Sequence, residues 1–182
     1  VTHGDARALK PGEWLTDDLI QFFTALVSND DRLSSPATFS VFSTFFYSRL
    51  MVKNACTYDA VASWTNSVDV FELKKLLIPI NVGNAHWIAA MVSMMGKYVQ
   101  VYDPFPDEED VFNEDSHRCF DHIMRFLRDE HVNKKGGTAL PEASNWRLVL
   151  QDPQLPTQPN GYNCGVFVSA FMYFSALDLP FR

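Results

Sequence analysis

Cysteine is scarce in this chain of 182 residues, which contains only Cys56, Cys119 and Cys164. An odd, small number of widely spaced thiols is not the pattern of a disulfide framework, so we expect a reducing compartment. The sequence also lacks N-x-Ser/Thr sites and any apolar run long enough to span a membrane. Disulfide-stapled and membrane-spanning proteins are therefore not expected.

Clusters of basic residues are equally absent. The longest runs of basic residues are the pairs Lys74-Lys75 and Lys134-Lys135, and the net charge is −7. A surface that binds nucleic acid or an anionic membrane needs concentrated positive charge, so neither partner is expected.

Apolar residues, in contrast, are plentiful. They make up 47% of the chain, and aromatic residues make up 14%, with fifteen phenylalanines. This composition is typical of a globular protein with an aromatic-rich core. At this length we expect one domain over residues 1–182.

Two helices are predicted in the N-terminal third. The first begins after Thr16, a suitable N-cap, with Asp17 and Asp18 in a first turn where negative charge is favourable. The second begins at Ser35-Pro36. Its apolar residues recur every three or four positions: Phe39, Phe42, Phe46 and Leu50. Short helical pieces are expected over residues 57–75.

Three strands are predicted next, over residues 76–82, 87–95 and 98–102, with Gly96-Lys97 as a hairpin turn. Such close succession implies an antiparallel meander. Pro79 has no backbone N–H to donate, which argues for an edge or irregular position in the first of these strands.

The remaining elements complete an α+β order. A helix is predicted over residues 114–131, with Cys119, Ile123, Phe126 and Leu127 facing inward, then a strand over residues 146–150 and a final helix. Helices therefore precede and follow the strands without alternating with them. We expect a central, mostly antiparallel sheet flanked by helices.

The final helix begins at a cysteine. The turn formers Pro159, Asn160 and Gly161 precede Cys164, and Asn163 suits the N-cap position. Backbone N–H groups and the helix dipole at this place favour the thiolate over the thiol. The apolar face expected after it comprises Val166, Phe167, Ala170, Phe171, Phe174 and Leu177. Taken alone, the segment also fits a buried structural cysteine.

Two upstream residues turn this thiol into a candidate nucleophile. His86 opens the second predicted strand and Asp103 closes the third, so the hairpin brings both to the same edge of the sheet. Asp103 can accept a hydrogen bond from one imidazole nitrogen, which leaves the other nitrogen facing Cys164. Gln158 can donate a hydrogen bond to an oxyanion beside the sulfur. Singly, His86 and Asp103 also fit a satisfied histidine and a turn former.

A second group of polar residues is a weaker candidate, for a metal site. His117, Cys119, Asp121 and His122 lie close together in the sequence. On a helix His117 and His122 do not share a face, and no second pair of ligands with structural-zinc spacing accompanies them. We therefore expect neither a metal nor another cofactor.

Several motifs follow a common order along nearly the whole chain: Trp14-Leu-Thr-Asp17, Phe42 to Tyr47, Pro79-Ile-Asn81 before His86-Trp87, Tyr102-Asp103, and Gln158-Pro-Asn-Gly-Tyr-Asn-Cys164-Gly165. In these motifs the chain closely resembles the catalytic domain of the ubiquitin-like-protein-specific proteases, the SUMO (sentrin) proteases, which are related to the adenovirus-type cysteine proteases. The resemblance implies a papain-like cysteine protease fold of the SUMO-protease type.

The resemblance also implies the chemistry. Cys164 matches the nucleophile, His86 the general base, Asp103 its orienter and Gln158 the oxyanion donor. The implied activity is that of a thiol isopeptidase and endopeptidase, which cleaves after the C-terminal Gly-Gly of SUMO or a related ubiquitin-like modifier. The implied partners are that modifier and its conjugates.

Substrate-binding residues follow from the same resemblance. Trp14 and Trp87 match two tryptophans that clamp the diglycine tail in a tunnel, and Asp17 matches a position that contacts the tail. Only residues without side chains can thread a tunnel walled by indoles. Without the resemblance, Trp14 would be taken as a core residue beside a helix.

Two features depart from the family pattern. Asn163 stands where family members usually carry Asp, and Asn caps a helix about as well, so we expect activity to survive. Family domains generally continue with further helical structure beyond the position of Arg182, and the chain opens at Val1 rather than Met. A short form or a trimmed fragment is therefore expected.

The sequence is also compatible with two other functions. One is an acetyltransferase, because some bacterial effectors of related fold use a His, acid and Cys set for acetyl transfer. The other is a pseudoprotease that binds a modifier without cleaving it. The implied location is the nucleus or cytoplasm of a eukaryotic cell, as a resident protein or a delivered effector, and a monomer is expected.

Overall fold

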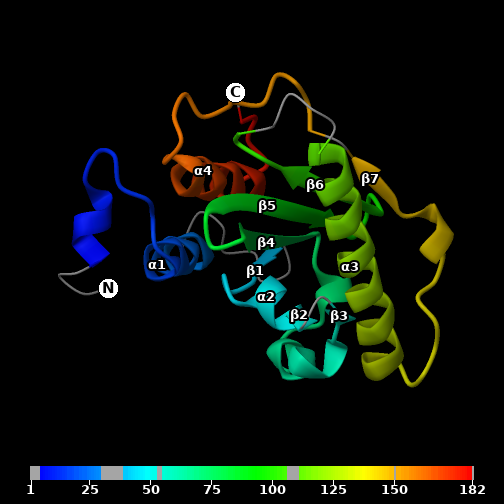
Figure 1. Ribbon diagram of the computed structural model, residues 1–182. Coiled ribbons are helices and arrows are strands. Elements are labelled where there is room, and N and C mark those ends of the chain that lie inside the picture. Colours follow the sequence, from blue (N-terminus) through cyan, green and yellow to red (C-terminus); the bar gives the residue numbers. More distant parts are fainter. Residues whose placement is uncertain (1–4, 30–38, 53–54, 106–110, 150, 182) are drawn as a thin grey trace.

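The computed structural model describes residues 5–29, 39–52, 55–105, 111–149 and 151–181 (Figure 1). It has the expected α+β architecture, with one central sheet between two layers of helices. Within those ranges, no helix is both long and apolar enough to cross a membrane.

The central sheet has five strands in the order β1-β4-β5-β6-β7. These are β1 (Phe39–Val41), β4 (Lys75–Val82), β5 (His86–Ser93), β6 (Tyr98–Tyr102) and β7 (Arg147–Val149). The three middle strands form the predicted antiparallel meander, while β1 pairs in parallel with β4 and β7 in parallel with β6. The prediction of the meander is therefore confirmed.

The turn between β5 and β6 follows from local chemistry. Lys97 has a φ of 49°, in the left-handed region. Gly96 makes close contact, since an added Cβ there would lie 2.6 Å from the ring of Tyr98. A glycine at this place lets the two strands reverse within a few residues.

The prediction for Pro79 was right only in part. β4 lies inside the sheet, so it is not an edge strand. However, β1 pairs only with Lys75–Leu77, and the Leu77 carbonyl points toward it, accepting from the N–H of Phe42 at 2.9 Å. Alternate residues of a strand point the same way, so the missing N–H of Pro79 faces the space beyond the end of β1. The proline is tolerated because no ladder bond is required there.

The predicted second helix was wrong over its first part. Phe39–Val41 forms β1, and only α2 (Phe46–Leu50) is helical. The predicted start at Ser35-Pro36 lies outside the described residues. Three- and four-residue spacing of phenylalanines is compatible with a helix, but pairing with β4 overrides that local pattern.

Helices cover both faces of the sheet. α1 (Asp17–Ser28) and α4 (Cys164–Ala176) pack on one face, and α2 and α3 (Val111–Lys134) pack on the other (Figure 1). The first face buries a cluster that includes Ile20, Leu77, Trp87, Tyr102, Cys164 and Phe171. The second buries a larger cluster that includes Phe46, Ile78, Val99, Ile123 and Phe126. Each large apolar side chain fully buried in this way contributes about 1.5–3 kcal/mol.

Several predicted details of the helices are confirmed. The Thr16 hydroxyl caps α1, accepting from the N–H of Leu19 at 3.4 Å. α3 extends three residues beyond both predicted ends, and its expected inward residues are all buried: Cys119, Ile123, Phe126 and Leu127.

Short elements complete the fold. The segment predicted to contain short helical pieces holds the 3-10 helices η3 (Tyr58–Ala60), η4 (Ala62–Thr65) and η5 (Val70–Glu72). Two more 3-10 helices are η1 (Asp5–Leu9) and η6 (Ala143–Asn145). β2 (Met51–Val52) and β3 (Ala55–Cys56) form a small antiparallel pair beneath α3.

Candidate active site

The β5–β6 hairpin brings His86 and Asp103 together. His86 is the first residue of β5, and Asp103 directly follows the end of β6. The last pair of the ladder joins Ala89 to Tyr102. Beyond that pair, His86 Nε2 lies 2.7 Å from Asp103 Oδ1. Because Nε2 faces the carboxylate, Nδ1 is the nitrogen left for a different partner.

Asp103 is held in this orientation by its own turn. Its Oδ1 also accepts a hydrogen bond from the backbone N–H of Phe105 at 2.8 Å. An Asp side chain that bonds the backbone two residues later is a common turn device. The aspartate before Pro104 is therefore both a turn former and the partner of His86.

Cys164 is the first residue of α4 and lies close to the imidazole of His86. It is only 2% exposed. The His86 side chain hydrogen-bonds to the thiol, and so do the backbone N–H groups of Trp87 and Gly165. The sulfur thus faces one imidazole and two amide donors, all of which stabilise negative charge.

The pKa values of the two side chains shift in opposite directions. Burial alone raises the pKa of the Cys164 thiol, but the hydrogen bonds and charge of His86, with the N–H of Trp87, bring it below its usual 9.0. Burial alone lowers the pKa of His86, but hydrogen bonds to Asp103 and Cys164 raise it to about 9. Both shifts favour a thiolate–imidazolium pair at neutral pH.

Gln158 lies in the loop that leads to α4. Its backbone N–H donates to the Pro104 carbonyl at 2.7 Å, which ties this loop to the end of β6. Its side chain is 6% exposed, and Nε2 donates to the Asn160 carbonyl. A primary amide carries two N–H bonds, so a second donor is left for a ligand.

Known proteins show which family the chain resembles. The model of the Ulp1 protease family, C-terminal catalytic domain, matches residues 13–182. The chain belongs to the Ulp1 protease family.

Relatives in this family share modest identity with the chain. It is 28% identical over 181 residues to human sentrin-specific protease 2, and 34% identical over 194 residues to ubiquitin-like-specific protease 1A of Arabidopsis thaliana. These alignments cover 99% and 100% of this chain. The chain spans only 28% and 36% of the length of those two relatives.

Solved structures of this family have the same fold. A structure of the SUMO protease Ulp1 with its catalytic cysteine oxidised to a sulfonic acid matches with a TM-score of 0.77 and 25% identity, over 100% of this chain and 75% of that one. The Ulp1 protease domain in complex with Smt3, the yeast orthologue of SUMO, matches with a TM-score of 0.80 and 24% identity, over 100% and 74%. The expected fold is therefore confirmed.

The N-cap position expected before Cys164 is confirmed in this Ulp1-family chain. Asn163 is the N-cap of α4, but its side chain makes no cap hydrogen bond to the described residues. The Asn160 side chain orders the turn instead, with Oδ1 accepting the N–H groups of Tyr162 at 3.1 Å and Asn163 at 3.0 Å.

The buried face of α4, in contrast, is rotated from the expected one. Val166 is 49% exposed, whereas the buried positions are Cys164, Gly165, Val168, Ser169, Phe171, Met172 and Ala176. α4 is apolar nearly all round, so its sequence pattern does not select one face. Packing against β5 and α1 selects it.

The substrate-binding residues predicted from the Ulp1-family resemblance lie in β5 and around the start of α1. Trp87 is 4% exposed, and its indole N–H donates to the Leu15 carbonyl at 3.2 Å. Trp14, next to Leu15, is 48% exposed, and Asp17 opens α1 in a half-buried position.

Gly165 explains how this segment approaches the nucleophile helix. A Cβ added at Gly165 would lie 2.9 Å from Leu15 Cβ and 3.2 Å from Ile20 Cδ1. Real Cβ atoms do not approach that closely, so a side chain here would displace Leu15 and the residues beside it. The glycine after Cys164 is required by packing.

Sequence reasoning missed one residue of the site. The Gln151 side-chain oxygen accepts a hydrogen bond from the backbone N–H of Asp103 at 2.7 Å. The two residues lie far apart in the sequence, and nothing in the local pattern around Gln151 indicates this contact. The Trp87 N–H that faces Cys164 was missed for the same reason.

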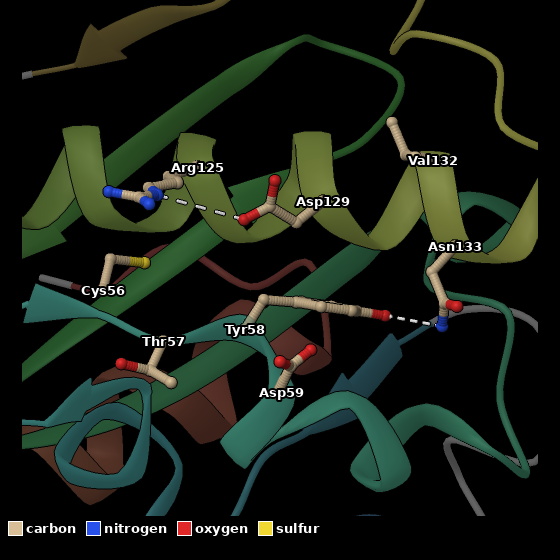
Figure 2. Close-up of a pocket in the computed structure, with 8 residues that line it drawn as sticks. All are labelled: Cys56, Thr57, Tyr58, Asp59, Arg125, Asp129, Val132 and Asn133. Carbon is tan, nitrogen blue, oxygen red and sulfur yellow. Dashed lines mark hydrogen bonds and ion pairs between the residues drawn. The ribbon is translucent and has the colours of Figure 1, made fainter.

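The other two thiols lie around α3. Cys56 and Tyr58 face the α3 residues Arg125, Asp129 and Asn133 across a pocket (Figure 2). The volume of this pocket is about 490 Å³. Burial raises the pKa of the Cys56 thiol. Burial also raises the pKa of Cys119, to about 12. Neither thiol has the surroundings of a nucleophile.

The polar residues of α3 have partners of their own. His122 Nδ1 lies 2.8 Å from the Tyr47 hydroxyl, and Cys119 is buried in the core. Across the described ranges, no three His, Cys, Asp or Glu side chains are grouped closely enough to hold a metal ion.

Proposed function

We propose that residues 1–182 are a single catalytic domain of a thiol protease, which cleaves after the C-terminal Gly-Gly of SUMO or a related ubiquitin-like modifier. The observation that carries this proposal is that the imidazole of His86 interacts with two partners, a carboxylate and a thiol. His86 bonds to Asp103 at 2.7 Å and also to the Cys164 thiol, whose pKa is lowered. A thiol, a base and an orienter in this order form the set that thiol acyl transfer needs.

In the first half of the reaction, Cys164 is the nucleophile. Its thiolate attacks the carbonyl carbon of the terminal glycine, a carbon–sulfur bond forms, and the carbonyl oxygen becomes an oxyanion. The second N–H of Gln158 donates to that oxyanion. The carbon–nitrogen bond then breaks, and the leaving amine takes a proton from the His86 imidazolium. The products are a thioester on Cys164 and a free amine.

In the second half, His86 acts as a base. The neutral imidazole takes a proton from water as the water oxygen attacks the thioester carbonyl. The carbon–sulfur bond breaks and releases the modifier with a free carboxylic acid, which loses its proton to water, while the thiolate–imidazolium pair is restored. Asp103 keeps the imidazole in the required tautomer throughout and stabilises its positive charge.

The burial of Cys164 favours a substrate whose reacting end is narrow. The residue is only 2% exposed, and Trp87 beside it is 4% exposed. A glycine pair, which has no side chains, suits such a confined approach. We propose that Trp14 and Trp87 line the path of the tail and that Asp17 contacts it.

Partners and location follow from the family. We propose that the partners are SUMO, or a related modifier, and its conjugates; a solved relative is the Ulp1 protease domain in complex with Smt3. We further propose that the protein acts as a monomer, without a metal or cofactor, in the nucleus or cytoplasm of a eukaryotic cell.

The proposal is tested with ubiquitin-like modifiers whose C-terminal glycine carries a thiol-reactive warhead. We expect a SUMO-type probe to add its mass to the protein, and peptide mapping to place the adduct on Cys164. Cys164→Ser is the matched control and should not be labelled, whereas Cys56→Ser should be labelled like the parent.

The same probes distinguish the other functions. A pseudoprotease would bind the modifier, and the Cys164→Ser change would alter neither binding nor the absence of turnover. An acetyltransferase would transfer acetyl groups and would show no preference for a Gly-Gly tail. Labelling of Cys56, or of no residue by any modifier, would contradict the proposed protease.

A further inference from the structure

Asp103 lies just beyond the last paired residue of β6, so its backbone N–H has no partner on a neighbouring strand that the structure describes. Over the described residues, β7 pairs with β6 as far as Gln100 opposite Val149, and β5 pairs with β6 as far as Tyr102. The N–H of Asp103 therefore lies beyond both ladders. A backbone N–H that lacks a partner away from water destabilises the fold and leaves its residue freer to turn.

The side chain of Gln151 replaces the missing strand partner. Gln151 lies two residues beyond Val149, on the side of β6 where β7 has ended. Its Oε1 accepts the N–H of Asp103 at 2.7 Å. Because the Asp103 carboxylate bonds to His86, any rotation of the Asp103 backbone moves the carboxylate away from the imidazole.

Two more hydrogen bonds fasten the same loop to the end of β6. The Tyr102 hydroxyl donates to the Pro156 carbonyl at 2.6 Å. The N–H of Gln158 donates to the Pro104 carbonyl at 2.7 Å. Residues on either side of Asp103 are thus bonded to the loop that carries Gln158.

We propose that Gln151 is a positioning residue, whose amide oxygen fixes the backbone of Asp103 and so aims the carboxylate at His86. This inference rests on the proposed function, because it assigns a role within the same site. The loop over residues 151–158 would then position two residues of the site relative to each other: the orienter Asp103 and the oxyanion donor Gln158.

A neutral acceptor suits this position. The groups that face His86 are the carboxylate of Asp103 and the thiol of Cys164. A carboxylate in place of the Gln151 amide would keep an acceptor for the Asp103 N–H but add negative charge near the imidazole. An apolar side chain would remove the acceptor. These two changes therefore have different consequences for a positioning role.

The test compares Gln151→Leu, Gln151→Glu and the matched control Gln154→Leu. Gln154 lies in the same loop with an exposed side chain. We expect Gln151→Leu to lower kcat about 10- to 100-fold with little change in KM, since displacements near 1 Å cost about that much. Gln151→Glu should restore most of kcat and move the alkaline limb of the pH profile upward. Gln154→Leu should match the parent.

A second readout does not require turnover. The pKa of His86, followed by NMR of the imidazole, should fall in Gln151→Leu, rise in Gln151→Glu and stay unchanged in Gln154→Leu. These shifts in a protein that turns over no substrate would support the positioning role and contradict the proposed function. An active parent whose kcat and His86 pKa are the same in all three variants would overturn the positioning role alone.

A loss of thermal stability is distinguished from a loss of positioning by the glutamate variant. If Gln151→Leu lowers kcat only in proportion to the fraction unfolded, and Gln151→Glu does not restore kcat, the inference is wrong. Tyr102→Phe gives a further comparison, because it removes the hydroxyl bond to Pro156 and keeps the ring stacked on Phe171. We expect a smaller loss of kcat, of about threefold to tenfold.

Discussion

Two regions of this molecule contain cysteines, and the same side chain has opposite properties in each. At the end of the β5–β6 hairpin, Cys164 faces an imidazole and two backbone N–H groups, and its pKa is lowered. Around α3, burial is the main influence on Cys56 and Cys119, and it raises the pKa of each thiol. Burial acts on all three thiols, so hydrogen-bond donors and a neighbouring imidazole make the difference.

The regions also differ in how their polar groups are used. Around α3, Tyr58 donates to the fully buried Glu130 at 2.6 Å. The Asn133 amide donates to the Tyr58 hydroxyl at 2.9 Å (Figure 2). Those bonds join the segment after β3 to α3. At the hairpin edge, the bonds between His86, Asp103 and Cys164 link groups that are able to exchange protons. One network stabilises the fold, and the other is suited to chemistry.

Cys164→Ser should give the largest contrast. We expect turnover of a SUMO-type precursor to fall by about 10⁴-fold or more, since the hydroxyl is a far weaker nucleophile at neutral pH. Cleavage is followed by gel densitometry under single-turnover conditions. Cys56→Ser is the matched change in the other region and should retain parental turnover; equal losses in both variants would abolish the distinction between the regions.

Asp103→Asn should have the next largest effect. The amide keeps the size of the side chain but presents the wrong hydrogen-bonding group to Nε2, so the imidazole adopts the wrong tautomer. We expect kcat to fall by about 10²- to 10⁴-fold. Asp59→Asn, in the α3 pocket, is the control. Parental turnover in Asp103→Asn would show that Asp103 does not orient His86.

The pH profile sharpens the same comparison. The pKa of His86 is raised to about 9, so the imidazolium persists through neutral pH and is lost as the pH rises through about 9. The lowered pKa of Cys164 keeps the thiolate present below the usual 9.0. We expect kcat/KM to be bell-shaped, with its alkaline limb centred near pH 9. An alkaline limb near 6.5, the ordinary value for histidine, would contradict a thiolate–imidazolium pair.

Trp14→Ala should have a moderate effect on binding. Trp14 is 48% exposed, so its loss should change the free energy of unfolding by no more than about 0.5 kcal/mol. We expect KM for the modifier to rise about tenfold if the indole lines the path of the tail. Trp87→Ala is less suitable, because burial of that ring predicts a stability loss of about 3–5 kcal/mol. An unchanged KM in a folded Trp14→Ala would remove Trp14 from the site.

Tyr58→Phe should leave turnover unchanged. It removes the donor to Glu130, which is 0% exposed, so the free energy of unfolding should fall by about 1–3 kcal/mol in denaturant titrations. Tyr98→Phe, at a half-buried ring on β6, is the comparison for stability. A tenfold loss of turnover in folded Tyr58→Phe would mean that the α3 region acts on the active site.

Sequence patterns predicted the central elements well, for reasons visible in the residues. The meander followed from short apolar runs separated by turn residues, and Gly96 and Lys97 form the tight turn that this pattern requires. The helix after Thr16 followed from a cap that the structure contains. The placement of His86 beside Asp103 followed from the hairpin, since two residues at the ends of antiparallel neighbours must meet.

The errors share a different cause. Phe39, Phe42 and Phe46 have helical spacing, yet the first lies in β1 because residues 75–77 offer it a strand partner. Pro79 lies inside the sheet because β1 ends before reaching it. In each case the outcome depended on a neighbour more than thirty residues away along the chain, or on where that neighbour ends.

Local chemistry alone therefore specified the hairpin, the caps and the residue types able to perform thiol chemistry, because turns, caps and strand pairs act over a few residues. Packing chose the partners: the imidazole and the N–H of Trp87 that face Cys164, and the Gln151 oxygen that holds Asp103. Those contacts join segments distant in the chain. A thiol becomes acidic only when such donors surround it, and their arrangement is a property of the folded chain.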